Sequence, residues 1–119
     1  MSVISELMGM PGTVAAGEFS FRGDRYSYEG NLSEEMARMA SIMCRSTSMS
    51  THMEADMLGT FCSEECGLIP AKGWAVRGPS YSVCVFHNYF CFMDNQQSDF
   101  NKVLHFMQQE LANTSDDLI

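Results

Sequence analysis

The sequence is short of basic residues and has no long apolar run. Its 119 residues include 15 acids against only 7 Lys and Arg, which gives a formal net charge of -8. A net anion repels phosphate backbones and anionic lipid surfaces, so we expect no nucleic-acid partner. No apolar stretch approaches the roughly 18 residues that a membrane-spanning helix needs, so we expect no membrane insertion.

The sequence also lacks the short motifs that mark common enzymes. It has no GxSxG, P-loop, HExxH or GxGxxG pattern. His52, His87 and His105 have no carboxylate or nucleophile at a catalytic spacing. We therefore predict a protein that is not an enzyme, with no catalytic residues, no cofactor and no metal site.

The N-terminal residues and the number of cysteines indicate in which cellular compartment the protein is found. The opening "MSVISELMGMPG" has no basic flank and does not resemble a signal peptide. Five cysteines, an odd number, fit poorly with a secreted disulfide framework. We expect a cytoplasmic protein whose thiols are mostly core side chains, Cys84 and Cys91 among them.

The stretch "FCSEECG" places Cys62 and Cys66 around two glutamates. A redox pair needs a stabilised thiolate, and the charges of Glu64 and Glu65 oppose one. A zinc site needs two more ligands, and no second Cys/His pair with suitable spacing follows. The pattern favours a bend between two strands over a thiol pair that does chemistry.

The first third of the chain predicts a helix and a hairpin. Residues 2–9 carry Val3, Ile4 and Leu7 on one side of a short helix. A small, apolar strand follows at 13–21, with Gly17 where another group packs closely. After a turn at 22–24, residues 25–30 alternate and complete a β-hairpin.

A longer helix is predicted over 32–48. Asn31 is the expected N-cap, with Glu34 at the capping-box spacing. At 100° per residue one apolar face contains Leu32, Met36, Met39, Ala40, Met43 and Cys44. This methionine-rich face has two interpretations, burial against the sheet or contact with a partner.

Three further strands and a last helix are predicted. Residues 52–62 alternate like a half-exposed strand, 68–78 form the next, and 81–93 read as one strand covered on both faces. Residues from 95 onward form an amphipathic helix. The order α-β-β-α-β-β-β-α gives an α+β fold, a five-stranded antiparallel sheet sandwiched by helices. We assign 1–113 to a single domain and 114–119 to a flexible acidic tail.

This order resembles the roadblock/LC7 (profilin-like) superfamily. The resemblance rests on a short helix, the strand beginning "GTVAAG" at Gly12, a Gly-containing hairpin and a helix rich in small residues and Met. More narrowly, "GEFS", "NLSEEMA", "KGWAV", "YSVCV" and "DFNKV" resemble a bacterial branch often met in sulfur-oxidising bacteria. None of these motifs is a catalytic signature.

The resemblance implies a homodimer built on the long middle helix and the third strand, here 32–48 and 52–62. Its interface residues would be Met36, Met39, Met43, Met53, Ala55 and Met57. It further implies a regulator or scaffold that binds a small Ras-like GTPase or a multi-subunit complex, one of sulfur metabolism included. The alternative is a thiol-based sulfur carrier or redox accessory protein that uses Cys62 and Cys66.

Overall fold

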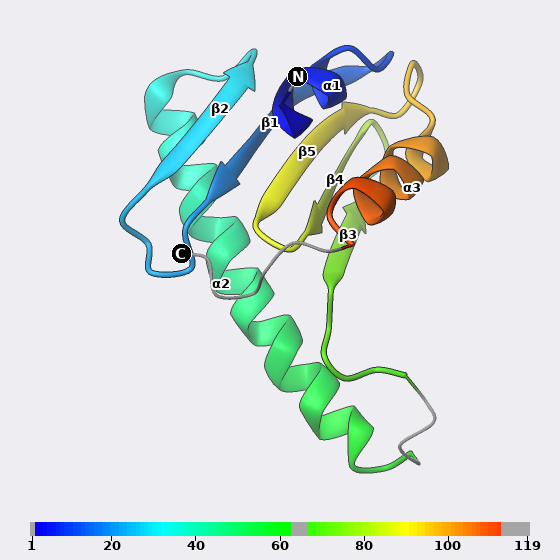
Figure 1. Ribbon diagram of the computed structural model, residues 1–119. Helices are drawn as coiled ribbons and strands as arrows, with labels where there is room; N and C mark the ends of the chain where they lie inside the picture. Colours follow the sequence, from blue (N-terminus) through cyan, green and yellow to red (C-terminus); the bar gives the residue numbers. More distant parts are fainter. Residues whose placement is uncertain (1, 63–66, 113–119) are drawn as a thin grey trace.

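The computed structural model describes residues 2–62 and 67–112. Within these ranges three helices and five strands follow one another in the predicted order (Figure 1). Their bounds are α1 Val3–Met8, β1 Thr13–Phe19, β2 Tyr26–Gly30, α2 Glu34–Gly59, β3 Gly73–Arg77, β4 Tyr81–Phe86, β5 Tyr89–Asp94 and α3 Phe100–Glu110.

The strands form one antiparallel sheet in the order β2-β1-β5-β4-β3. Helices α1 and α3 lie on one face of this sheet and α2 crosses the other (Figure 1). The predicted α+β sheet between helices is therefore confirmed. Strands β2 and β3 are its two edges.

Alternating side chains of the strands fill a separate core on each face. Under α1 and α3 the buried cluster consists of Ile4, Leu7, Ala16, Cys84, Cys91, Met93, Val103, Met107 and Leu111. Under α2 it consists of Phe19, Cys44, Val85 and Phe90, with Phe21, Tyr26, Tyr28, Trp74 and Phe92 packed around them. The helix that supplies Cys44 thus meets a sheet face made mostly of aromatic side chains.

The first hairpin is confirmed, and so is the close packing at Gly17. Strands β1 and β2 pair with Gly17 opposite Tyr28. A Cβ on Gly17 would lie 2.5 Å from the Phe90 ring and 2.5 Å from the carbonyl oxygen of Ser27. The glycine is needed because the neighbouring strand and this ring leave no room for a side chain.

The predicted strand at 52–62 is wrong, because residues up to Gly59 belong to α2. The alternation of Met and Ala with acids over 53–57 fits a strand, but Met, Glu, Ala and Leu are also strong helix formers. The predicted helix over 32–48 ends within a Ser- and Thr-rich stretch, residues 45–51, but in the structure this whole stretch is helical. There the Ser48 hydroxyl accepts a 2.8 Å hydrogen bond from Trp74 Nε1–H, which fastens this turn to β3.

The helix also begins two residues later than expected. Its N-cap is Ser33, whose hydroxyl accepts a 3.1 Å hydrogen bond from the Met36 N–H. Asn31, the predicted cap, lies before it, and its N–H donates to the carbonyl oxygen of Val14. The β2–α2 connection is thereby tied to β1.

The predicted strand at 81–93 is two strands joined by a tight turn at His87 and Asn88. The buried amide of Asn88 donates a 2.8 Å hydrogen bond to the carbonyl oxygen of Phe19. His87 has a left-handed φ of 55°. This division supplies the fifth strand of the sheet in place of the false strand at 52–62.

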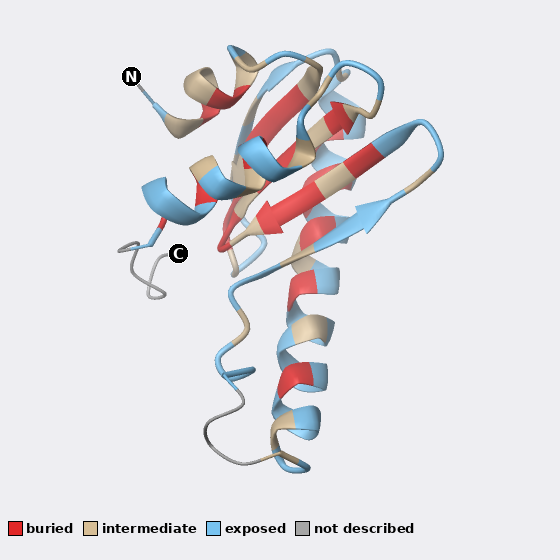
Figure 2. Cartoon of the chain, turned by 90° about the vertical axis from the view of Figure 1, so that its right-hand side faces the viewer, coloured by how far each residue is buried: buried red, intermediate tan, exposed pale blue. Residues whose placement is uncertain are grey.

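Helix α2 packs on the sheet through small side chains. Its buried residues are Ala37, Ala40, Ser41, Cys44, Ser48 and Ala55. With 26 residues the helix is about 39 Å long, whereas strands of five to seven residues span roughly 17–24 Å. Its C-terminal half therefore extends past the sheet (Figures 1 and 2), with one side buried and the other exposed along its length (Figure 2).

Three cysteines lie in these cores and are free thiols. Loss of solvation on burial raises the pKa of Cys44 to about 12, that of Cys84 to about 12 and that of Cys91 to about 11. These thiols are core side chains, as predicted for Cys84 and Cys91. Residues 114–119, the predicted tail, lie outside the described residues.

Replacement of Gly17 by Ala tests the packing between β1, β2 and β5. We expect Gly17→Ala to lower the free energy of unfolding by about 1–3 kcal/mol, because a backbone oxygen and a buried ring must shift. Gly9→Ala is the matched control, since its Cβ meets nothing closer than 3.4 Å, and it should change stability by less than about 0.5 kcal/mol. Equal losses in urea titrations of the two variants would contradict this packing.

Alkylation tests the burial of the three thiols. A pKa near 12 in place of 9 leaves roughly a thousandfold less thiolate at pH 8, and burial also blocks access. We expect iodoacetamide to label Cys44, Cys84 and Cys91 at least about a hundredfold more slowly in the folded chain than in urea, as read by peptide mass spectrometry. Similar rates in both states would show that these cysteines are accessible.

Candidate protein-interaction surface

The side of α2 that faces away from the sheet is apolar and exposed. Seven residues form it, here called the outer stripe: Met36, Met39, Met43, Ser46, Ser50, Met53 and Met57. Its five methionines keep between 48% and 69% of their surface exposed. At 100° per residue the stripe lies roughly 150° around the helix from the buried side. Of the two interpretations of Met36, Met39 and Met43, burial against the sheet is therefore wrong, because all three side chains are exposed.

The outer stripe has the spacing of a helix-pairing face. Its successive members are alternately three and four residues apart, which is the period of residues that meet in packed helix pairs. None of the seven is charged. Exposed Ile42 and Met49 widen the apolar surface on one side.

The same stripe is symmetric about residue 48. Met39 and Met57 are equidistant from it, as are Met43 and Met53, and Ser46 and Ser50. The two small serines lie nearest the centre, where a crossing helix approaches most closely. A face of this kind is complementary to a second copy of itself in antiparallel orientation, as an interface with twofold symmetry requires.

An apolar groove runs between the first half of α2 and the sheet. It has a volume of about 610 Å³. The side chains that line it come from the helix and its approach (Leu32, Ser33, Glu35, Met36, Met39, Ala40 and Met43) and from the sheet (Val14, Tyr81 and Phe92). The groove opens beside the outer stripe, so the two share their N-terminal methionines.

Strand β3 borders this region as an edge of the sheet. Val76 lies on the α2 face directly opposite Val83 of β4 and is 57% exposed. An edge strand presents backbone groups that are able to pair with another strand. Apolar side chains, a groove and a strand edge therefore lie together on one side of the molecule.

The predicted interface residues are only partly brought together on this surface. Met36, Met39, Met43, Met53 and Met57 all lie on the outer stripe, whereas Ala55 is buried, with 8% exposure. Met53 and Met57 reach the surface from a helix, since the third strand is β3 and not 52–62. Sequence reasoning missed Ser46 and Ser50, although the alternating three- and four-residue spacing through 57 contained the signal.

The predicted thiol pair is described only in part. Cys62 follows α2 and is disulfide-bonded, with its Sγ 3.6 Å from the carbonyl oxygen of Leu58, and Cys66 lies outside the described residues. The bend that we predicted here follows a helix, not a strand. In residues 2–62 and 67–112 no group of three or more His, Cys, Asp or Glu side chains is arranged to hold a metal ion. Nor does any helix in these ranges have the length and apolarity to cross a membrane.

Comparisons with known proteins agree with the fold. Residues 3–109 match the model of a family described as "Uncharacterized conserved protein (DUF2173)". No curated protein matches the chain.

Similar solved structures include the gliding protein MglB from Thermus thermophilus, with a TM-score of 0.71 at 13% identity over 90% of this chain and 78% of that one. An MglB structure described as having a tetrameric arrangement gives 0.71 at 15%, with the same coverage. A roadblock/LC7 domain from Streptomyces avermitilis gives 0.66 at 15% identity, covering 92% of this chain and 89% of that one. The chain therefore belongs to the family described as "Uncharacterized conserved protein (DUF2173)" and has the fold of roadblock/LC7 domains.

Proposed function

We propose that this protein is a non-enzymatic regulator or scaffold that forms a homodimer through α2 and binds a small Ras-like GTPase. The observation that carries the proposal is the uncharged outer stripe of α2, with its five exposed methionines. Large exposed apolar patches on soluble proteins usually mark sites of association. Methionine suits such a site because its flexible side chain adapts to the surface that it meets.

The symmetry of the stripe favours a second copy of this chain as the first partner. In an antiparallel pair centred on Ser48, Met43 of one copy meets Met53 of the other, and Ser46 meets Ser50. Full burial of a methionine side chain contributes about 1.5–3 kcal/mol, and twofold symmetry uses each methionine twice. A stable dimer forms only if this gain exceeds the free-energy cost of association, about 4–15 kcal/mol or more, which comes mainly from lost translational and rotational freedom.

A GTPase as the further partner follows from the resemblance to roadblock proteins, which regulate or scaffold small Ras-like GTPases. The net charge of -8 adds a physical requirement. Electrostatic potentials of opposite sign speed the encounter of two proteins and disfavour wrong partners. The docking surface of a GTPase that binds this acidic chain should therefore be basic. The groove between α2 and the sheet offers such a partner an apolar site beside the dimer contact.

The sulfur-carrier alternative rests on thiol chemistry, which the three buried cysteines do not favour. Cys44, Cys84 and Cys91 are buried with raised pKa values, so little reactive thiolate forms. The alternative then depends on Cys62, which is disulfide-bonded, and on Cys66. A link to sulfur metabolism stays a prediction, since no family or structure matched above refers to it by name.

Charge substitutions on the outer stripe test both the dimer and its register. Met43→Lys alone should weaken self-association at least about tenfold, because it buries an unpaired charge, and Met53→Glu alone should do the same. A mixture of the two variants should regain the dimer, since the introduced ammonium of one copy then meets the introduced carboxylate of the other. Light scattering after size exclusion measures each species.

The control mixture combines Met43→Lys with Met43→Glu. In the proposed antiparallel pair, position 43 of one copy and position 43 of the other lie ten residues apart along the helix axis, which is about 15 Å. The opposite charges at these two positions are therefore too far apart to restore the dimer. Lys102→Glu on α3 controls for net charge alone. A monomeric wild-type chain at high micromolar concentration would refute the dimer, and equal rescue by both mixtures would refute the register.

Affinity capture tests the GTPase. We expect the immobilised chain to retain a Ras-like GTPase from lysate of its native host, in amounts that depend on whether GDP or a GTP analogue is present. The two purified proteins should then bind directly, and more weakly at high salt. Turnover of a small compound by the purified chain, lost on replacement of one cysteine or histidine, would overturn the non-enzymatic assignment.

A further inference from the structure

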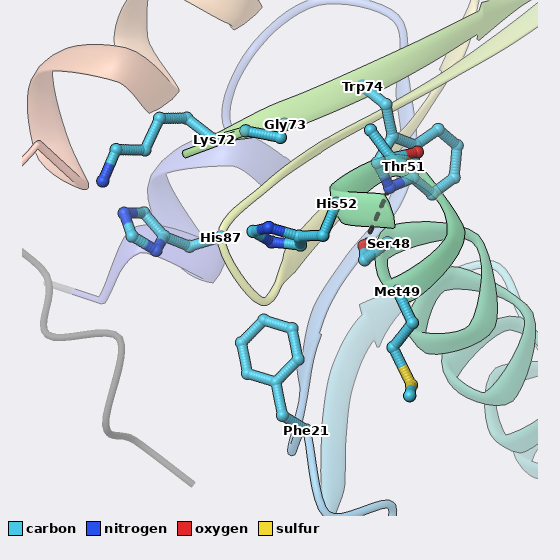
Figure 3. A pocket seen from close by; sticks show the side chains of 10 residues that line it. Phe21, Ser48, Met49, Thr51, His52, Lys72, Gly73, Trp74 and His87 are labelled. Atoms are coloured by element: carbon cyan, nitrogen blue, oxygen red, sulfur yellow. Dashed lines mark hydrogen bonds between the residues drawn. The ribbon is translucent and has the colours of Figure 1, made fainter. Parts of the chain in front are cut away.

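Besides the apolar groove, α2 borders cavities that polar side chains line. One of about 250 Å³ lies beside the middle of the helix and holds His52 and Trp74 (Figure 3). Another, of about 300 Å³, lies where the first half of α2 passes the loop between β1 and β2. Three arginines line this second space, here called the arginine cavity: Arg25, Arg38 and Arg45.

The arginine cavity concentrates positive charge in a strongly acidic protein. The sequence has 15 acids and only 7 bases, yet three of its five arginines meet here. Asp24 is the one acid in the described lining, and Arg22 pairs with it at 3.7 Å. Within residues 2–62 and 67–112 this is the one ion pair, so the three cavity arginines have no acid paired with them. The cavity therefore carries a net positive charge that an anion is able to neutralise.

Arg45 is held in place against the loop between β1 and β2. Its Nε–H donates a 2.6 Å hydrogen bond to the carbonyl oxygen of Phe21. A Cβ on Gly23, whose φ is 82°, would lie 3.3 Å from this Nε and 3.4 Å from Cζ, so the guanidinium lies directly on the turn. The bond to Phe21 uses one of the five N–H groups of the guanidinium and leaves the terminal ones for another acceptor.

Arg25 and Arg38 reach the cavity from opposite sides. The loop that carries Arg25 is fixed by the buried hydroxyl of Ser20, which accepts 3.0 Å hydrogen bonds from the N–H groups of Asp24 and Arg25 and donates a 2.8 Å bond to the Asp24 carboxylate. Arg38 precedes Arg45 by about two turns of α2, so both lie on the same side of the helix. Among the residues that the structure describes, neither the Arg25 nor the Arg38 guanidinium is in a hydrogen bond or an ion pair.

From this arrangement we propose that the arginine cavity binds a phosphate group, either inorganic phosphate or a small phosphate monoester. A guanidinium presents a planar fork of N–H donors that matches two phosphate oxygens at once. A phosphate monoester has a charge near -2 and three acceptor oxygens, which suits three arginines better than the single charge of a carboxylate does. The volume is at the lower end of the roughly 300–1,000 Å³ of small-molecule sites, and the half-buried Tyr26 is available to an organic group. This site does not depend on the proposed dimer or on a GTPase.

The amide resonance of Gly23, which lines the cavity, provides a direct readout by NMR. At about pH 8 the phosphate monoester is a dianion, since its second pKa is about 6. We expect inorganic phosphate and phenyl phosphate to shift the Gly23 resonance saturably, and acetate at the same ionic strength to have little effect. Arg25→Gln and Arg38→Gln should each weaken phosphate binding by about tenfold, because each removes charge-assisted hydrogen bonds. Tighter binding of phenyl phosphate would identify a monoester as the ligand, and equal binding would identify inorganic phosphate.

Arg77→Gln on β3 is the matched control. It removes the same charge from an exposed arginine that does not line the cavity, and it should leave phosphate binding unchanged. Arg38→Lys keeps the charge but loses the fork, and should weaken binding severalfold. The proposal is overturned if neither phosphate at about 10 mM, an excess over a weak Kd of about 1 mM, shifts the Gly23 resonance. It is also overturned if acetate binds as tightly as phosphate, or if Arg25→Gln and Arg38→Gln bind phosphate no more weakly than Arg77→Gln does.

Discussion

The close packing of α2 against the sheet is the constraint on which the rest of this structure depends. The sheet contributes large side chains at this contact, Phe19 and Phe90 among them, and the helix contributes alanine, serine and cysteine. Interiors tolerate few voids, so bulk on one side requires small residues on the other. The methionines of α2 therefore have no place in this core and lie on the opposite side of the helix. An exposed apolar surface follows from how the helix is buried.

The same contact fixes the surroundings of that surface. A hydrogen bond from Trp74 to Ser48 joins the middle of α2 to the edge strand β3, and Arg45 Nε donates a 2.6 Å bond to the carbonyl oxygen of Phe21 beyond β1. These polar contacts fasten the helix at two points along its length, at Ser48 and at Arg45. The outer stripe, the groove and the edge strand consequently have a defined arrangement, and a partner that reads all three meets a preorganised surface.

Sequence patterns predicted most of the fold because they act locally. Apolar spacing predicted α1 and α3, and alternation with a glycine turn predicted the β1–β2 hairpin. The failures occurred where tertiary contacts decide. The stretch from Arg45 to Thr51 stays helical because Ser48 bonds to Trp74, a residue 26 positions away that no local pattern connects to it. The β4–β5 turn was missed because buried strands are apolar on both sides of it and His87 is an unusual residue for a left-handed position.

The interaction surface was harder to predict because composition alone does not say which way a residue faces. An amphipathic pattern normally places large apolar residues inward, and in α2 this expectation is reversed. Met49 shows the consequence, since it widens the outer stripe and also lines the cavity that holds His52 and Trp74. A helix that pairs on the stripe would therefore contact a side chain that also forms part of the wall of this cavity.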